Sequence, residues 1–532
     1  MNLFEKAINI ISPSIGFKRA YNRMKLQALS TYSGQTTKRS MVGFNPRVDD
    51  PNTNTNRTLP DLRGKSRELV NTSSIGKSVI DVKSINIVGS GLHVESRIEH
   101  DILGISKEKA QEKQNLIERR FALWAKGNEV DMMQSDNFYS MQSKVFRAML
   151  IDGDVLSLLY ILSHDKRRPN QLNPLTIQNV GAHQLCNPQN RQDTETMIGG
   201  IDIDSHGAPK AYNIVSPSNK SLSFDGAMYG KWSKISKYGS KSGRLNVIHF
   251  KNPESRIGQY RGIPCLAPVI DLIYDLTKYQ KSELTATVIS SFFTVFVKTA
   301  SGDAERSPIA QFKAPTDPQD SLLVNGSVAS EATEADSNQY QFGEGMINHL
   351  AEGEDITTAT PNRPNTAFEA FVQAMLTEIG MGIGVPYEML VKKHQSSYSA
   401  SRAAFLDAWQ AFSQSREWIA TQWCQPVYES WLELEVVNGD IELPGFLENP
   451  MFRKAWSAAT WHGDARGVLD PVKSVKRSIM LIDNHLSTRE REARMHTGGD
   501  WDQIVTRDAY EQKKIRDLRA TTTPITEADN EK

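Results

Sequence analysis

Residues 361–434 constrain the fold of this chain more than any other stretch, because they predict two helices joined by a loop. Thr366 to Ile379 carries large apolar side chains at the spacing of one helical face. Gly-Met-Gly-Ile-Gly-Val-Pro follows at 380–386, and alternating glycines before a proline disfavour a continued helix. A longer helix is predicted after the loop, from about 399 to 434, with a kink at Pro426.

The loop between these helices is basic and rich in hydroxyl groups, and glycines stand at its start. Its polar side chains follow one another directly: Lys392, Lys393, His394 and Gln395, then serines and a tyrosine. Gly380, Gly382 and Gly384 are candidate hinge residues, because glycine accepts backbone angles that other residues avoid. A surface αα-hairpin with two solvated lysines explains the same pattern without any special role.

The long helix after the loop carries large aromatic side chains, and two interpretations of them stay open. They fill the core of their own subunit, or they hold subunits together. The residues concerned are Trp409, Phe412, Trp418 and Trp423.

Length and charge narrow the class of protein. A chain of 532 residues is too long for one ordinary core, so two to four domains are expected. With 62 Lys and Arg against 62 Asp and Glu, the net charge is zero, which argues against tight wrapping of nucleic acid but allows a local basic patch. No run approaches 18 apolar residues, so we expect no transmembrane helix and no membrane partner.

The cysteines predict neither a disulfide framework nor a metal site. Cys186, Cys265 and Cys424 are far apart and odd in number, and no CxxC pair or His/Cys cluster accompanies them. We therefore expect no bound metal and no cofactor, and folding in a reducing compartment.

The rest of the chain mixes helix and strand patterns, so the predicted class is α+β. A basic arm and polar linker occupy 1–60, and a helix begins at Asp61. The other predictions are a strand pair over 84–97, a helix over 112–127, a helix from 138 ending at a turn over 151–155, a hairpin over 198–215, a strand over 247–250, a long helix over 266–290 and a polar excursion over 301–361.

Two pairs of carboxylates could hold metal ions, which keeps a nuclease reading open. Asp152 and Asp154 form one pair, and Asp202 and Asp204 form the other. Two-metal chemistry on nucleic acid needs converging carboxylates. Both pairs are explained as turn residues, and the sequence favours turns over a metal site.

The order of several segments resembles the lambda-like family of bacteriophage portal proteins, over roughly residues 60–510. No single residue carries this resemblance. The segments are Arg67 with Val88-Gly-Ser-Gly91, Met149-Leu-Ile-Asp-Gly-Asp-Val155, Ile198-Gly-Gly-Ile-Asp202 with Gly207-Ala-Pro-Lys-Ala-Tyr212, His249 with Gly258-Gln-Tyr-Arg-Gly-Ile-Pro264, Trp461-His-Gly-Asp-Ala-Arg-Gly467 with Leu469-Asp-Pro-Val-Lys473, and Gly498-Gly-Asp500.

The resemblance implies a non-enzymatic ring of twelve subunits at one capsid vertex of a virion, assembled in the host cytoplasm. Double-stranded DNA would be packaged through its channel by the terminase large subunit and later ejected. A head–tail adaptor and tail would attach to it, and the major capsid and scaffold proteins would surround it. A DNA-binding capsid scaffold protein without a pore remains the alternative.

The resemblance also implies a division of the chain. The arm and linker would cover 1–60, a mixed α/β wing 61–262, stem helices 263–290 and 362–382, a small α/β clip 291–361, the tunnel loop 383–398, a long spine helix and helical crown 399–510, and a disordered tail 511–532. In that arrangement the tunnel-loop residues Lys392, Lys393, His394 and Gln395 and the stem residues Lys278 and Lys281 would face the channel.

Overall fold

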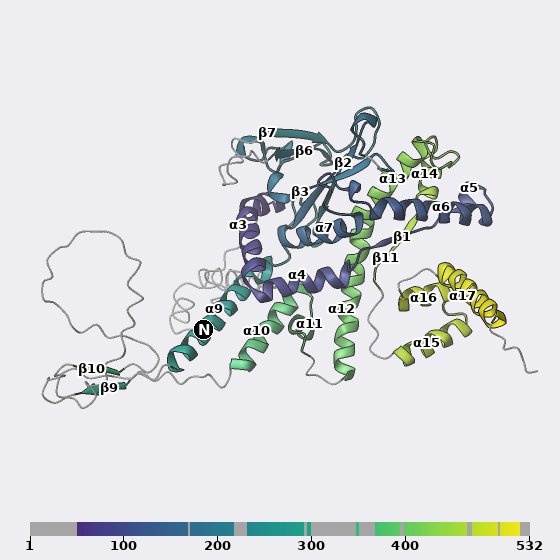
Figure 1. Cartoon of the computed structure of the whole chain (residues 1–532). Helices are drawn as coiled ribbons and strands as arrows, with labels where there is room; N and C mark the ends of the chain where they lie inside the picture. Colours follow the sequence, from purple (N-terminus) through teal and green to yellow (C-terminus); the bar gives the residue numbers. More distant parts are fainter. Residues whose placement is uncertain are drawn as a thin grey trace, which may run out of the picture. The chain divides into compact units, whose positions relative to one another are not determined.

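The computed structural model describes residues 50–168, 171–216, 231–291, 295–298, 347–350, 368–393, 398–464, 471–497 and 501–521 (Figure 1). The chain divides into two units, and the cores and sheets described below lie in the second, which begins at Thr55. Helices occur in this unit together with small sheets that are mainly antiparallel, so the predicted α+β class is confirmed. No helix within these ranges combines the length and apolar character needed to cross a membrane.

Seven helices of the described residues lie between Pro51 and Ile383. They are α3 (Pro51–Thr72), α4 (Ser74–Ile87), α5 (His100–Leu103), α6 (Lys107–Lys126), α7 (Phe138–Asp152), α9 (Ile270–Ser291) and α10 (Phe368–Ile383).

The remaining helices of the described ranges follow the stem. They are α11 (Tyr387–Val391), α12 (Tyr398–Ile419), α13 (Gln425–Val437), α14 (Pro450–Trp456), α15 (Pro471–Asp483), α16 (Arg489–Thr497) and α17 (Trp501–Thr521).

Within the part of the chain that the structure describes, four small sheets accompany the helices. Three are antiparallel: β1 (His93–Ser96) with β11 (Ala459–His462), the order β3-β2-β8, and the order β4-β5-β6-β7. The fourth pairs β9 (Val295–Lys298) with β10 (Ile347–Leu350) in parallel. The strands of the two larger sheets are β2 (Asp154–Ile161), β3 (Leu175–Gly181), β4 (Met197–Ile198), β5 (Ile201–Ile203), β6 (Pro209–Ser216), β7 (Lys231–Ser236) and β8 (Val247–Lys251).

Strand β2 separates two hydrophobic cores because its side chains alternate between the faces of the sheet. Val155 and Leu159 pack into the larger core with the helices. Leu156 and Leu158 pack into a smaller core against β5 and β6 of the other sheet. The predicted turn at Gly153 and the predicted hairpin around 204–208 are both confirmed.

The aromatic side chains of the long helix pack mainly in the core of their own subunit. Trp423 is fully buried and Phe412 nearly so, while Trp409 and Trp418 are half-buried against the same core. Trp423 stacks on Phe138 with ring centroids 5.3 Å apart, and its indole N–H donates to Ser157 Oγ at 2.8 Å.

The long helix continues to Val437, and its irregularity lies just before Pro426. Residues Ala420–Cys424 form one π-helical turn between α12 and α13. Proline has no N–H to donate to the preceding turn, and a π turn is one way in which a helix accommodates this. The predicted kink is thus realised as a widened turn.

Three predictions of local structure are wrong. Residues 84–97 do not form a strand pair, because Ile87 and Val88 are buried at the end of α4 and only β1 follows. Residues 51–60 are not a linker but the first part of α3, whose first turn Asp50 caps by accepting from the N–H groups of Asn52 and Thr53.

The third wrong prediction is that the C-terminal tail is disordered from residue 511. Helix α17 runs to Thr521, so this expectation fails for 511–521, and residues 522–532 lie outside the described ranges. Its good helix formers, such as Glu511, Lys513 and Leu518, favour the helix despite the polar composition. The basic arm at 1–49 also lies outside the described residues.

The two helices expected to form a stem, α9 and α10, differ from their expected limits. Helix α9 begins at Ile270 rather than 263, since Pro264 and Pro268 interrupt the chain before it. Helix α10 begins at Phe368, and residues 362–367 are not described. The two helices pack together through Tyr279, whose ring centroid lies 5.7 Å from that of Phe368.

Replacing Trp423 should destabilise the subunit itself. We expect Trp423→Ala to cost about 3–5 kcal/mol, because it empties a fully buried site and removes the hydrogen bond to Ser157. The melting temperature of the purified protein measures this, with the exposed Leu406→Ala on the same helix as control. Equal melting temperatures for both variants would contradict a core role.

Candidate functional site

The loop after α10 does not begin where its glycines suggest. Gly380 and Gly382 are both helical, and α10 ends only at Ile383. A Cβ at Gly380 would meet the carbonyl oxygen of Val385 at 2.5 Å, and one at Gly382 would meet Val269 Cγ1 at 2.6 Å. These glycines therefore allow close packing, and the prediction that they break the helix is wrong.

Gly384 is the one glycine of the three that has a left-handed backbone. Its φ is +69°, and nothing lies within 4 Å of a Cβ added there. Helix α11 then starts at Tyr387, so a short helix occupies part of the expected loop. A hinge role stays a prediction, and the backbone angles favour Gly384 for it.

Helix α11 is held against α4, and this contact positions the loop lysines that follow it. Ser78 Oγ on α4 donates to the carbonyl of Leu390 at 2.8 Å. Arg416 on α12 donates to the carbonyls of Ile87 and Asn86 at the end of the same helix α4, at 2.9 and 3.0 Å. Helix α4 therefore holds both α11, before the loop lysines, and α12, after them.

The two loop lysines differ in their surroundings. Lys392 follows α11 with a left-handed backbone, φ +55°, and its side chain is exposed. Lys393 is also exposed and lies 3.3 Å from a carboxylate oxygen of Glu369 on α10. His394 and Gln395 lie outside the described residues.

The stem lysines lie on the outer face of α9. Lys278 and Lys281 are one turn apart and exposed, while Ile273 and Leu276 on the opposite side are buried. The predicted face is thus solvent-accessible in the single subunit.

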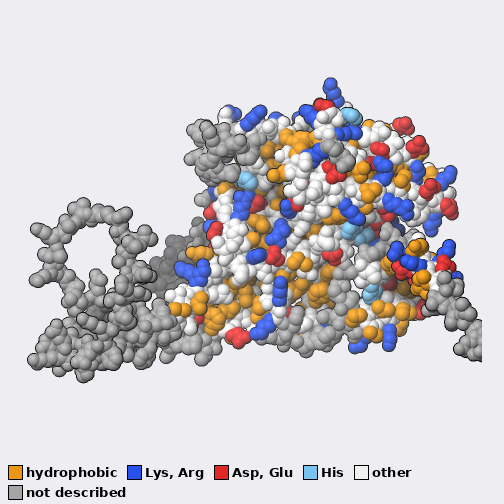
Figure 2. Space-filling model, viewed as in Figure 1, with side chains coloured by type: hydrophobic (Ala, Val, Ile, Leu, Met, Phe, Trp, Pro, Cys, Tyr) orange, Lys and Arg blue, Asp and Glu red, His pale blue; other side chains and the backbone are white. Residues whose placement is uncertain are grey.

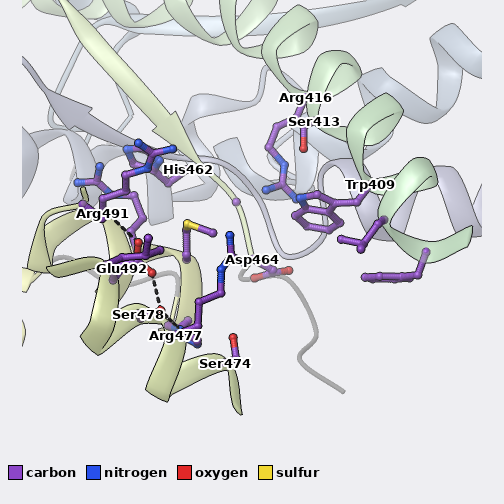
Figure 3. Close-up of a pocket in the computed structure, with 18 of the residues that line it drawn as sticks. Trp409, Ser413, Arg416, His462, Asp464, Ser474, Arg477, Ser478, Arg491 and Glu492 are labelled. Carbon is purple, nitrogen blue, oxygen red and sulfur yellow. Dashed lines mark hydrogen bonds between the residues drawn. The ribbon is translucent and has the colours of Figure 1, made fainter. Parts of the chain in front are cut away.

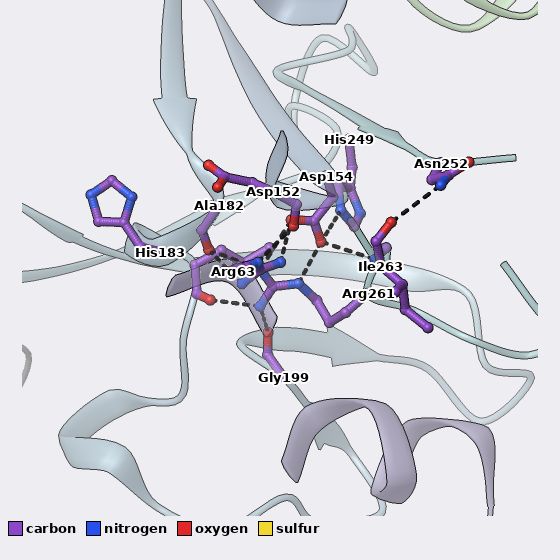
Figure 4. Close-up of polar contacts among 12 residues, drawn as sticks. Arg63, Asp152, Asp154, Ala182, His183, Gly199, His249, Asn252, Arg261 and Ile263 are labelled. Atoms are coloured by element: carbon purple, nitrogen blue, oxygen red, sulfur yellow. Dashed lines mark hydrogen bonds and ion pairs between the residues drawn. The ribbon is translucent and has the colours of Figure 1, made fainter. Parts of the chain in front are cut away.

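A buried ion cluster lies at the junction of α3, β2 and β8 (Figure 4). The Asp154 carboxylate is fully buried and accepts from Arg63 at 2.7 Å and from Arg261 at 2.7 and 3.2 Å. His249 Nε2 lies 3.3 Å away, and the Gly262 N–H donates at 3.2 Å.

The electrostatics of this cluster favour fixed charges. Burial alone would raise the pKa of Asp154, but the charges of Arg261 and Arg63 and the His249 hydrogen bond hold it well below its usual value. Burial lowers the pKa of Arg63 to about 10 and lowers that of His249. Asp154 is therefore ionised and Arg63 is charged at neutral pH.

The other carboxylates of the nuclease hypothesis also have structural partners. Asp152 binds Arg67 through two hydrogen bonds of 2.7 and 2.8 Å. Asp202 pairs with Lys234, and Asp204 closes its turn by accepting from the N–H groups of two following residues. Within the described ranges, no three His, Cys, Asp or Glu side chains are grouped so that they could hold a metal ion.

The sequence did not predict the ion cluster, although the two segments that supply Asp154 and Arg261 are both among those that resemble the portal family. The segment 149–155 supplies Asp154, and the segment 258–264 supplies Arg261. A Cβ at Gly262 would lie 1.9 Å from the carbonyl oxygen of Gly153, so the two glycine turns meet backbone to backbone. Arg63 and Arg67, one turn apart on a predicted helix, were the available signal for the third partner.

The comparisons agree with the resemblance. The family model for the phage portal protein, lambda family, matches residues 37–416. The chain therefore belongs to the lambda family of phage portal proteins, and its role is that of a portal, a component of the virion.

Two characterised relatives are similar over most of the chain. Portal protein B of Escherichia phage lambda is 25% identical over 472 residues, which cover 86% of this chain and 85% of that protein. The portal protein of Escherichia phage N15 is 25% identical over 466 residues, covering 85% and 84%.

Solved structures of gene transfer agent particles are also similar. A chain from the neck, computed with C12 symmetry, has a TM-score of 0.38 and 10% identity, covering 80% of this chain and 92% of that chain. A chain from the virion has a TM-score of 0.36 and 12% identity, covering 81% and 92%.

Removing the buried carboxylate should destabilise the fold around α3, β2 and β8. Asp154→Asn leaves Arg63 and Arg261 buried without a counter-charge, so we expect a loss of about 3–5 kcal/mol. The matched control, Asp61→Asn, breaks an exposed pair with Lys65 and should change stability by less than about 1 kcal/mol. Chemical denaturation of both proteins at pH 7 measures the difference.

The same variant has a predicted pH dependence. Because folding lowers the pKa of Asp154, its contribution is complete above the unfolded pKa, about 3.9, and is lost as the pH falls further. The stability gap between wild type and Asp154→Asn should therefore stay constant from pH 7 to 5 and narrow only below about pH 4. A gap that narrows near pH 6 would implicate a histidine instead.

Proposed function

We propose that this portal protein forms a closed ring of twelve subunits whose channel carries double-stranded DNA into the capsid and out again. Membership of the portal family supports this proposal. The stem would be the packed pair of helices α9 and α10, and the tunnel loop would begin after Ile383. Packaging would be driven by the terminase large subunit, so we assign no catalytic step to this chain.

The charge distribution suits a conduit that does not hold DNA tightly. Each phosphate contact adds a salt-dependent term to affinity, so a strongly basic channel would retain the DNA. The net charge of the chain is zero, and on the face shown in Figure 2 basic and acidic side chains are intermixed. A few exposed lysines, Lys278 and Lys281 on the stem and Lys392 on the loop, provide weak contacts.

The ring also provides attachment surfaces. We propose that the clip, 291–361, docks the terminase before packaging and the head–tail adaptor afterwards, and that the major capsid and scaffold proteins surround the ring during assembly in the host cytoplasm. The polar composition of this segment supports a surface used by successive partners, because transient interfaces are less apolar than obligate ones. Most of it lies outside the described residues.

Imaging of the purified protein tests the ring directly. A closed ring with an axial hole supports the portal channel, whereas monomers or dimers would favour a capsid scaffold protein without a pore. The single observation that carries the proposal is the family match, so the ring is the first property to measure.

Reversing the charge of Lys392 should weaken contact with DNA without preventing assembly. We expect Lys392→Glu rings to form and to bind terminase, while particles package shorter DNA or lose it, since an acidic group then faces the phosphates. Lys393→Gln should have a smaller effect, because Lys393 already pairs with Glu369.

The control for this experiment is Lys109→Glu, on the exposed side of α6 in the wing. Packaged DNA length, measured by gel electrophoresis of DNA extracted from particles, separates the variants. If Lys392→Glu and Lys109→Glu package and retain DNA alike, the loop does not meet DNA.

Shortening the clip should abolish docking, and the parallel pairing of β9 with β10 decides how to do it. Parallel strands need a crossover of about a dozen residues or more, so a very short bridge would break the pair. Replacing Asp303–Glu344 with about 12 Gly and Ser residues keeps both strands. We expect rings that bind neither terminase nor adaptor in pull-down assays, and normal terminase binding would refute the assignment.

A further inference from the structure

A cavity of about 610 Å³ lies between α12, β11 and the helices α15 and α16 (Figure 3). Cavities of this size are typical of sites for small ligands. The described residues that line it include five arginines and two carboxylates. The partners of these charged groups show how far the subunit balances them itself.

Both carboxylates of the cavity bind neutral donors. Asp464 accepts from the N–H and the hydroxyl of Ser90 at 2.8 and 2.6 Å. Glu492 accepts from the hydroxyls of Ser478 and Ser487 at 2.5 and 2.6 Å. Within the described ranges, neither carboxylate forms a direct ion pair with an arginine that lines the cavity.

Three of the arginines have side chains without a hydrogen bond or ion pair to any described residue. They are Arg402 on α12, Arg477 on α15 and Arg491 on α16, and all three are exposed. Arg494 differs, because it pairs with Glu95 on β1. With Arg494 set aside and the histidines counted as neutral, four arginines stand against two carboxylates, which is an excess of two positive charges.

The fourth of these arginines, Arg416, is half-buried and is held by neutral groups. It reaches the cavity from α12 and donates to the carbonyls of Ile87 and Asn86 at 2.9 and 3.0 Å. Its guanidinium also lies over the ring of Trp409, 5.1 Å from the centroid. Burial lowers the pKa of Arg416, and the charge of Asp464 opposes this. A partly buried charge without a paired counter-charge is costly, so the site favours an anion.

The helices that close the cavity are not held there by an apolar core. Among the described residues, neither hydrophobic core includes a side chain of α15, α16 or α17. Helix α16 is instead attached by ion pairs, Arg494 with Glu95 and Glu490 with Arg97. Since α12, α15 and α16 all contribute arginines to the cavity, like charges oppose their approach on that side.

We propose that this cavity binds a phosphate dianion, which bridges α12 to α15 and α16. Guanidinium groups match phosphate oxygens in geometry as well as in charge. A phosphate group carries about two negative charges near neutral pH, which equals the excess of positive charge in the cavity. Bound there, it replaces repulsion between the helices with attraction.

Two sources offer this chemistry, inorganic phosphate and the terminal group of a small phosphate monoester. The ring of Trp409 already stacks on Phe405, with centroids 6.2 Å apart, so recognition is assigned to the phosphate rather than to a stacked base. The proposal concerns one subunit and does not depend on the ring.

Calorimetric titration of the full-length protein, purified without phosphate, tests the site. Inorganic phosphate and a nucleoside monophosphate are titrated separately, at an ionic strength held constant with sodium chloride, because salt screens exposed charges. We expect saturable binding with one site per subunit, and the tighter of the two probes identifies the source. Absence of saturable binding by both probes would overturn the proposal.

Paired variants locate the binding. Arg402→Gln and Arg477→Gln each remove a charge-assisted hydrogen bond, so we expect each to raise the Kd for the tighter probe about tenfold or more. Lys476→Gln removes the same charge from α15 at an exposed residue that does not line the cavity, and it should leave the Kd unchanged. Equal effects of Arg477→Gln and Lys476→Gln would indicate general attraction of anions and contradict the site.

Hydrogen exchange of the α15 amides tests the bridge. We expect saturating phosphate to slow this exchange in the wild type and not in Arg477→Gln. The variant is the control, because phosphate also stabilises proteins generally by exclusion from their surface. Binding without slower exchange, or slowing that persists in the variant, overturns the bridge.

A nucleic-acid competitor separates the small ligand from DNA. Duplex DNA without terminal phosphates is added to the protein saturated with phosphate, at the same ionic strength. We expect no displacement from the cavity. If the duplex displaces phosphate, and does so in Lys476→Gln but binds weakly to Arg477→Gln, the cavity belongs to the DNA backbone and the small-ligand proposal fails.

Discussion

The carboxylate of Asp154 joins parts of the chain that are far apart in sequence. Arg63 reaches it from α3 and His249 from β8, while Arg261 reaches it from the segment that leads into α9. A buried carboxylate is tolerated only when partners supply hydrogen bonds and opposite charge. The need for these contacts therefore constrains where each of the three elements can lie relative to Asp154. Since α9 packs on α10, the position of α10 depends on this cluster as well.

Close backbone approach reinforces the same junction. The turns at Gly153 and Gly262 have no room for a side chain between them, and Gly262 also donates its N–H to Asp154. Further along the chain, Gly380 and Gly382 serve the stem in the same way, by bringing α10 close to Val269 and to its own returning chain. In this protein several glycines that resemble hinges in the sequence are instead points of close contact, where a side chain would not fit.

Local patterns predicted much of the fold, because helical and strand periodicity reflect the burial of neighbouring side chains. The helix over 112–127, with Phe121 and Trp124 in the core, and the hairpin leading to Tyr212 are examples. Features fixed by distant contacts could not be read in this way. Strand β1 pairs only with β11, near the other end of the chain, so the segment from 84 had no local sign of its true partner.

The candidate loop was predictable in part for the same reason. Its position between two helices followed from periodicity, but the pairing of Lys393 with Glu369 depends on how α11 packs against the body. The ion cluster shows the limit most clearly. Asp154 and Arg261 were noted as parts of sequence motifs, yet only the folded chain shows that they bind each other.

The π turn at Ala420–Cys424 sets the rotational phase of everything that follows it in the helix. An α-helix advances about 100° per residue, and a π turn holds one extra residue without breaking the rod. Loss of that one residue would restore regular helix, yet it would swing Tyr428 and Trp431 about 100° out of the core in which both are fully buried. Length variation among relatives should therefore be rare inside this helix and concentrate in the connections beyond Val437.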